Sequence, residues 1–500
     1  MAISAIPAFL GTAFSLAELG DGFGMYMDMY LLGLGWTESY VIISQVFRGI
    51  VDLCLKGVIG DVIDKTTWDR RYFLGISAIA IAASSLLVFF VKGTDTLDLI
   101  LVNGVRILES VALAFLGPTF GAITLSAFGP EMFDAMNIQK EVVSHAGSIL
   151  SNILSAVMAY FLYPNIQMVF LLPLVFAASA IFFLRHVPIG DPLMGRGFHA
   201  HTEQRDEKTG AVINTHKDEP PPTPSAYRDV FLDKRIVAMI AADVFHIMAD
   251  ANVGLIFNET LAGVGSFTDN NQFDNDDVIV DDYFIFDDDL NDDDNVMSRS
   301  AIPYLATAGS LAQISMILGT ILVGYLTTVK GWGRKPFYII HLSIHPIRVV
   351  LILWCFRVGA GQAVLASTEL VGGLTGAFGI VNAFMRADIL FGSGRFNVVD
   401  GVQATIGGIA RTGSQLIGAY ILSQGGPQVA LAVSLVISII PPVIGWIFVP
   451  ETLGMREIDF QQEKYQRVSC KDPCAAMSEE VDDDYDLMAE TEKIQRLEQS

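Results

Sequence analysis

The sequence predicts an all-α integral membrane protein whose twelve transmembrane helices form two sets of six. Three observations lead to this prediction. Apolar residues make up 52% of the chain and charged residues only 17%, below the roughly 25% charged that is usual for soluble domains. The apolar residues gather in runs of about 20, long enough to cross a hydrocarbon core of ~30 Å. A polar stretch separates six such runs from six more.

The individual helices follow from the apolar runs between polar, glycine or proline breaks. The N-terminal run lacks the basic region and cleavage site of a signal peptide, so it is interpreted as a retained first helix. The fourth run is long enough to tilt or to end near Gly129-Pro130. The predicted helices span residues 5–32, 38–60, 72–92, 96–127, 142–163 and 166–185, then 235–258, 302–328, 336–357, 361–385, 398–423 and 428–449.

The polar stretch 186–234 divides the chain into two halves. It contains Pro220-Pro221-Pro222 among charged residues, a composition that buries no core and is typical of a linker. The sequence therefore predicts an N-terminal six-helix bundle at 1–185 and a C-terminal six-helix bundle at 235–452. A polar tail follows at 453–500.

Lysine and arginine predict the orientation of these helices. Basic residues gather between the second and third helices, between the eighth and ninth, and in the linker, whereas the connections 33–37 and 424–427 have none. Cytoplasmic loops are the ones enriched in Lys and Arg. Both termini are therefore expected in the cytoplasm, without a decision between plasma and organelle membranes.

The net charge of -23 is concentrated in the tail and in an acidic segment, 267–295. By the same orientation this segment is a non-cytoplasmic loop. Its aspartates form no D-x-D-x-D-G pattern with a terminal Glu, so a solvated, repulsive loop is favoured over weak cation attraction. The net charge says little about the cargo.

The connection after the second helix has a pattern that recurs in the second half. It runs Gly57-Val58-Ile59-Gly60-Asp61, then Asp64-Lys65 and Asp69-Arg70-Arg71, and the later copy runs Gly324, then Gly331-Trp332-Gly333-Arg334-Lys335. This pattern resembles the signature loop of the major facilitator superfamily, which has Gly, three residues, Asp, a basic residue, then Gly and paired basic residues. The resemblance implies two six-helix repeats, as in other carriers with internal repeats.

The resemblance also implies a charged latch at the cytoplasmic mouth, which breaks when the halves move. The expected gate residues are Gly57, Asp61, Lys65, Arg70, Arg71, Arg334 and Lys335. The match departs from the family pattern at Val62, at Asp64, where Gly is usual, and at Thr328, where the second copy lacks the Asp. The alternative is that these charges only set the topology.

Four further stretches extend the likeness across residues 5–452, toward a bacterial and fungal branch of unassigned substrate. These are Ser144-His145-Ala146-Gly147, Phe245-His246, Gly392-Ser393-Gly394-Arg395-Phe396-Asn397 and Pro450-Glu451-Thr452. Arg106-Ile107-Leu108-Glu109 also looks like the family's second motif. Because an unpaired charge within the membrane is costly, Arg106 is expected to pair with Asp21 or Glu18 of the first helix.

The resemblance implies that the first, fourth, seventh and tenth helices line a central cavity. Asp243, His246 and Asp250 occupy i, i+3 and i+7, one stripe of a helix, which is expected to face that cavity and could load and release a proton. Packing is the alternative role for His246. The full set of expected substrate and proton residues is Glu18, Asp21, Arg106, Glu109, Asp243, His246, Asp250, Glu369 and Arg411.

The predicted function is a secondary active transporter that moves a small solute by alternating access, with proton coupling as an additional possibility. A non-transporting membrane sensor on the same fold is the alternative. An enzyme is not expected: there is no H-E-x-x-H, P-loop or serine nucleophile motif, although His341 and His345 at i and i+4 could ligate a metal. The expected partners are a small-molecule substrate and the lipid bilayer, with no cofactor, metal or nucleic acid, and the chain is expected to be a monomer.

Overall fold

The computed structural model describes residues 4–36, 38–66, 68–162, 166–198, 204–205, 212–213, 224–262, 301–453 and 455. The acidic segment 267–295 lies outside the described residues, as do most of the linker and nearly all of the tail. The side chains of Glu18 and Asp21 also fall outside the description. The chain divides into two units, Met1–Leu453 and Gly454–Ser500, and all of the helices named below belong to the first.

The described chain is almost entirely helical. Short helical turns at Val88–Phe90, Ile166–Leu171, Met194–Arg196 and Tyr325–Val329 extend or join the main helices, and two-residue strands β1 (Gln204–Arg205) and β2 (Val212–Ile213) pair in the linker. The helices are α1 (Ala5–Gly33), α2 (Glu38–Lys65), α3 (Arg70–Leu87), α4 (Thr96–Leu162), α5 (Leu172–Leu184), α6 (Tyr227–Phe231), α7 (Lys234–Ala262), α8 (Ala301–Gly324), α9 (Arg334–Val358), α10 (Gln362–Ser367), α11 (Glu369–Leu390), α12 (Phe396–Ser438) and α13 (Ile440–Phe448).

Both α4 and α12 consist of two helical limbs that meet at a glycine. Gly129 has φ 77° and Gly426 has φ 72°, values that favour glycine, and a proline follows each of them. Proline has no N–H to continue the hydrogen-bond ladder, so the chain reverses there. The breaks confirm the expected helix end near Gly129-Pro130 and the separation of the last two predicted helices.

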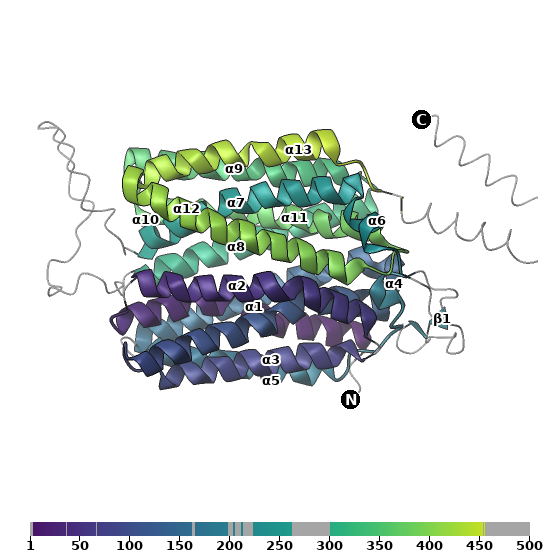
Figure 1. Cartoon of the computed structure of the whole chain (residues 1–500), viewed down its shortest axis with the longest axis horizontal. Helices are drawn as coiled ribbons and strands as arrows, with labels where there is room; N and C mark the ends of the chain where they lie inside the picture. The colour runs from purple at the N-terminus through teal and green to yellow at the C-terminus, as the bar shows by residue number, and fades with distance from the viewer. Residues whose placement is uncertain are drawn as a thin grey trace, which may run out of the picture. The chain divides into compact units, whose positions relative to one another are not determined.

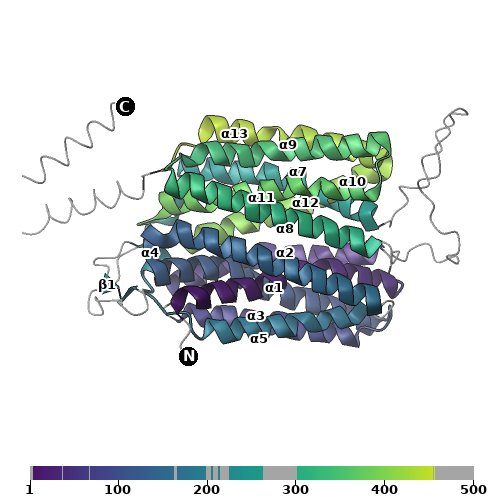
Figure 2. The same ribbon diagram turned by 180° about the vertical axis from the view of Figure 1, so that it is seen from behind.

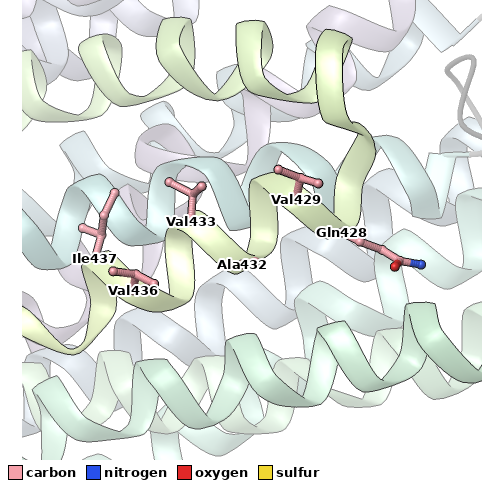
Figure 3. A pocket seen from close by; sticks show the side chains of 6 residues that line it. All are labelled: Gln428, Val429, Ala432, Val433, Val436 and Ile437. Atoms are coloured by element: carbon pink, nitrogen blue, oxygen red, sulfur yellow. The ribbon is translucent and has the colours of Figure 1, made fainter.

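The helices are long and apolar enough for a multi-pass membrane protein. Eight stretches of the described residues have the length and hydropathy to cross a bilayer. The count of twelve spans stays a prediction. An apolar groove on the second limb of α12 fits a surface that faces lipid, because valines point into it with Gln428 at one end (Figure 3). Its lining residues are Gln428, Val429, Ala432, Val433, Val436 and Ile437.

The helices before and after the linker form two groups, purple to blue and teal to yellow in Figures 1 and 2. In the first group, α1, α3, α4 and α5 pack around buried Phe9, Leu74 and Phe128. In the second group, α7, α8, α9, α11 and α13 pack around buried Tyr338 and Val381. Each half therefore has an apolar core of its own.

The two halves meet along two helix pairs. The first limb of α12 packs on α2 so closely that a Cβ added to Gly60 would lie 2.3 Å from the carbonyl oxygen of Asn397. The second limb of α4 packs on α8, where His145 Nδ1 lies 2.6 Å from Gln313 Oε1. We call the end where α2 stops at Lys65 and α12 starts at Phe396 the linker end. The sequence predicts that it is cytoplasmic.

Candidate functional site

The stripe on α7 points toward α9, within the C-terminal half. Asp243 is 6% exposed and accepts hydrogen bonds from Tyr338 Oη of α9 (3.1 Å), from Asn382 Nδ2 of α11 (2.6 Å) and from the Gln403 side chain of α12. Among the described residues, no cationic group lies within 4.0 Å of its carboxylate. Asp243 is therefore a buried carboxyl group held by neutral donors.

Three histidines cluster beside this aspartate. The ring of His246 lies 4.7 Å from that of His341 and 5.1 Å from that of His345, centroid to centroid. His341 Nδ1 is 2.6 Å from the carbonyl oxygen of Thr375, so its Nδ1–H is the donor. His246 Nδ1 is buried and has no hydrogen-bond partner in the described part of the chain. The cluster therefore has nitrogens able to take or give a proton.

Asp250 and Glu369 share one arginine at the other end of the cluster. Arg348 of α9 donates to Asp250 Oδ1 at 2.9 Å and also binds Glu369, the first residue of α11. His345 Nδ1 lies 3.7 Å from the same oxygen of Asp250. The Asp250 side chain is 40% exposed, whereas that of Arg348 is 10% exposed. Asp250 is thus the residue of this otherwise buried ionic group whose side chain is exposed.

Hydrogen bonds continue from Asp243 toward the linker end. Arg386 of α11 donates to Gln403 Oε1 at 2.9 Å and to Asp400 Oδ1 at 2.5 Å, and Gln403 in turn binds Asp243. Polar side chains therefore follow one another through the C-terminal half, and we call them the C-half polar chain. Its members are Asp400, Arg386, Gln403, Asp243, Tyr338, Asn382, His341, His246, His345, Asp250, Arg348 and Glu369.

That the α7 stripe faces a central cavity stays a prediction. The structure adds that α9 has a polar stripe of its own, Tyr338, His341, His345 and Arg348, at i, i+3, i+7 and i+10. That spacing matches the stripe of α7 and could have revealed the pairing. In the described residues, no group of three His, Cys, Asp or Glu side chains could hold a metal ion.

The N-terminal half has a smaller ionic group. Arg106 and Glu109 on the first limb of α4 are 1% and 2% exposed, with 3.7 Å between Nη1 and Oε2. Arg48 of α2 approaches Glu109 to 3.6 Å, and its carbonyl oxygen accepts a hydrogen bond from Ser110. The expected partners of Arg106 in α1, Glu18 and Asp21, have side chains outside the described residues. Their pairing stays a prediction.

At the linker end, Asp61 meets the linker and α12 together. It pairs with Lys65 at 2.5 Å, accepts a hydrogen bond from Tyr227 of α6 and lies 3.5 Å from Arg395. The Arg395 guanidinium stacks over the Tyr227 ring at 3.9 Å. Burial works to raise the pKa of Asp61, but the hydrogen bonds from Lys65 and Tyr227 outweigh it and lower that pKa. Asp61 is therefore a charged anchor for the linker.

Asp64, one turn further on, is bonded to the start of α12. It accepts hydrogen bonds from Asn397 Nδ2 (2.7 Å) and from the Val398 N–H (2.8 Å) and is 4% exposed. Burial raises the pKa of Asp64 to about 7, against these hydrogen bonds. Asp64 departs from the family pattern only when that pattern is aligned at Gly57. Aligned at Gly60, the sequence has Gly60, three residues, Asp64 and Lys65, which fits the pattern, and both Gly60 and Asp64 contact α12.

The remaining basic residues of the first loop bind the start of the linker. Arg70, 4% exposed, donates to the carbonyl oxygen of Pro192 at 2.9 Å, and Arg71 donates to that of Val187 at 2.7 Å. Gly57 donates from its backbone N–H to Thr405 Oγ1 across the halves, at 3.1 Å. The predicted gate residues of the first copy therefore all lie at the linker end.

The second copy forms a latch of different composition. Arg334 binds Asp388 of α11 and, at 2.5 Å, Asp134 of the N-terminal half. The Glu451 carboxylate accepts from the backbone N–H of Arg334 (2.8 Å) and of Lys335 (3.0 Å), the first residues of α9. Thr328 only bonds within its own helix. Asp388 and Asp134 thus supply the acids that Thr328 lacks.

Comparison with known proteins supports the expected family. No protein-family model matches the chain. An uncharacterized MFS-type transporter of Mycobacterium tuberculosis, found in two strains, is 24% identical over 420 residues, which cover 83% of this chain and 86% of the relative. The crystal structure of the human organic anion transporter MFSD10 (TETRAN) superposes with a TM-score of 0.55 at 14% identity, over 88% of this chain and 98% of that one. The resemblance to the major facilitator superfamily is therefore confirmed, and the chain is a multi-pass membrane protein with the major facilitator fold.

Proposed function

We propose that the protein is a secondary active transporter that moves a small solute across a membrane by alternating access and couples this movement to protons through the C-half polar chain. The fold and the relatives named as transporters support the general class. The arrangement of Asp243, His246 and Asp250 supports the coupling. Their contacts also favour proton loading inside the C-terminal half rather than on a wall between the halves.

The observation behind the coupling is the buried Asp243. A charged carboxylate with no cation in direct contact is costly to keep away from water, whereas its neutral form costs less. Tyr338, Asn382 and Gln403 surround it with uncharged groups. His246 follows one turn later on the same helix. A proton on this carboxyl group is therefore favoured when no water reaches it, and a change in access would release it.

The contacts at the linker end support alternating access. Asp64 and Asp134 each bind a residue of the opposite half, and both bonds are polar contacts at the end of a helix. Such contacts can exchange with water when the halves separate, although buried apolar residues of both halves, Phe133 and Phe396 among them, also meet there and would have to part. The bundles 1–185 and 235–452 would then move against each other, with the 186–234 linker joining them.

Reconstitution in proteoliposomes tests this proposal. An imposed pH gradient should drive accumulation of a solute found by screening amino acids, sugars, organic anions and organic cations. Asp243→Asn and Asp250→Asn should abolish accumulation but leave solute exchange, which needs no net proton movement. Asp95→Asn, on an exposed connection, is the matched control. Unchanged pH-driven accumulation in both variants would refute the coupling, and the absence of any flux would favour a sensor.

A further inference from the structure

The first limb of α12 has two faces that contact neither of its main neighbours. On one side it packs on α2, where a Cβ on Gly49 would lie 2.6 Å from Thr412 Oγ1. On the other side Ser414 donates to the Met248 carbonyl oxygen of α7 at 2.6 Å, and Gly418 lies against Asn252. Between these two contact sides, the helix has one face on each flank that contacts neither α2 nor α7.

These two free faces differ in chemistry. One is apolar and exposed, with Ile409, Leu416 and Tyr420 at 51%, 53% and 69% exposure, as a surface against lipid should be. The other has Ala404, Gly408, Arg411 and Gln415, at i, i+4, i+7 and i+11. At 100° per residue, Arg411 lies about 200° around the helix from Ile409. Arg411 therefore points inward, away from lipid.

Arg411 differs from the other arginines at this depth in lacking a carboxylate. Arg48, Arg106, Arg348 and Arg386 each have one within 4.0 Å. Arg411 is exposed and has no ion pair among the described residues. An isolated charge inside a membrane protein is costly and usually marks a functional site. The N–H groups of the Arg411 guanidinium are therefore available to a ligand from outside the chain.

The carboxylate that interacts with Arg411 among the described residues already has another partner. Asp250 interacts electrostatically with Arg411, but its hydrogen bond goes to Arg348, and His345 and His246 also face it. Glu369 is held by Arg348 as well. The two positive charges of Arg348 and Arg411 thus balance the two negative charges of Asp250 and Glu369. The fork of paired N–H groups on the Arg411 guanidinium is not used in this group. A planar carboxylate is the anion that fits such a fork with two parallel hydrogen bonds.

We propose that Arg411 binds the carboxylate of a small organic anion, which is the cargo. This inference rests on the proposed transport function and names its substrate class. With the anion bound, the group at Arg411, Asp250, Arg348 and Glu369 has one excess negative charge. A proton taken up by the C-half polar chain restores the balance, so a monocarboxylate would cross together with one proton and without net charge movement.

Binding to the purified full-length chain tests the proposal without requiring flux. Lactate, malate, inorganic phosphate and neutral glucose are added to wild type, Arg411→Gln, Arg411→Lys and the control Arg357→Gln, which removes an exposed arginine at the end of α9. Lactate or malate should raise the melting temperature of wild type and the control. Arg411→Gln should weaken this binding at least about tenfold, and Arg411→Lys less, because an ammonium lacks the fork.

The melting temperature without ligand separates binding from a structural role. Arg411→Gln should melt close to the wild-type temperature, because Arg411 has no hydrogen bond or ion pair among the described residues; a large drop would indicate a structural role and overturn the proposal. If only phosphate or added phosphatidylglycerol raised the melting temperature, the ligand of Arg411 would be a phosphate or a lipid headgroup, and the carboxylate proposal would be wrong. Carboxylate binding without flux would refute the transport function only. A pH-driven flux of glucose, with no response to carboxylates, would refute this inference only.

Discussion

The Asp64 carboxylate accepts a 2.8 Å hydrogen bond from the backbone N–H of Val398, which joins the end of α2 to the start of α12. The first N–H groups of a helix have no partner within the helix, and negative charge is favourable there. Asn397 adds a side-chain hydrogen bond to the same carboxylate. Asp64 is therefore one of the acidic residues that bond the two halves to each other at the linker end, together with Asp61 and Asp134.

Asp64→Asn should change how stability depends on pH. Burial raises the pKa of Asp64 to about 7 in the folded protein, whereas an unfolded aspartate titrates near about 3.9. The folded state thus binds the proton more tightly, so this contribution to stability is full below about pH 4 and is lost as pH rises through 7. Between about pH 8 and pH 6, wild type should gain roughly 1 kcal/mol relative to Asp64→Asn.

Melting temperatures across this pH range measure the effect. Asp229→Asn on the exposed side of α6 is the control and should follow wild type. Parallel pH profiles for wild type and Asp64→Asn would show that Asp64 does not titrate in this range.

Gly60→Ala should separate the two halves at the linker end. The added Cβ would lie 2.3 Å from the Asn397 carbonyl oxygen and 2.9 Å from Val398 Cα, both backbone atoms that have no rotamer to change. Overpacking of this kind typically costs about 1–3 kcal/mol. Maleimide labelling of a Val398→Cys reporter, buried at 4% exposure in the parent protein, should therefore become faster.

Gly104→Ala is the matched control for this prediction, because a Cβ there meets nothing within 4 Å. It should leave the labelling rate unchanged and keep or raise the melting temperature, since Ala favours helix over Gly by ~1 kcal/mol. Equal labelling rates in the two variants would mean that the halves tolerate the extra methyl group.

Tyr227→Phe should loosen the same end by a smaller amount. The change removes the hydrogen bond to Asp61 but keeps the ring beneath Arg395. Because this hydrogen bond is exposed to solvent, its loss should cost on the order of 1 kcal/mol, so the Val398→Cys reporter should label about fivefold faster. Tyr227→Ala removes the stacking too and should exceed Tyr227→Phe. If Tyr227→Phe labels at the parent rate, the linker does not hold the gate closed.

Composition and breaks were sufficient to predict a bundle of membrane helices, because the bilayer leaves few alternatives, whereas the two-repeat fold was predicted from the recurring loop pattern and its likeness to the family. Apolar runs of membrane length must be helices, and Gly129-Pro130 marked a chain reversal that the structure confirms. The same reasoning missed the polar face of α9. Its polar residues were weighed only as a local pair, His341 and His345, although Tyr338 and Arg348 continue the same stripe.

The register of the gate loop shows the other limit of sequence reasoning. Two aspartates, Asp61 and Asp64, each follow a glycine (Gly57 and Gly60) with three residues between, so spacing allows two alignments with the family pattern. Only packing separates them, because Gly60 and Asp64 contact the α12 backbone while Asp61 contacts the linker. Arg411 was predicted as a cavity residue from its depth, but its lack of a carboxylate depends on tertiary contacts.

The second latch predicts different effects for the two acids bound to Arg334. Asp388 is 1% exposed, belongs to the same half as Arg334 and also accepts a hydrogen bond from Thr452 at 2.9 Å. Asp388→Asn should therefore lower the melting temperature, since truncating one partner of a buried ion pair typically costs about 3–5 kcal/mol. Asp134→Asn breaks the ion pair with Arg334 between the halves and should mainly speed labelling of the Val398→Cys reporter.

A double-mutant cycle isolates the contact between Arg334 and Asp134. Arg334→Gln should speed labelling by itself, and Asp134→Asn should add little in that background, because the ion pair is already absent. Additive effects of the two changes would mean that Asp134 acts through another residue. The cycle is read from labelling rates, since Arg334→Gln also removes the bond to Asp388 and would lower the melting temperature for a reason unrelated to the gate.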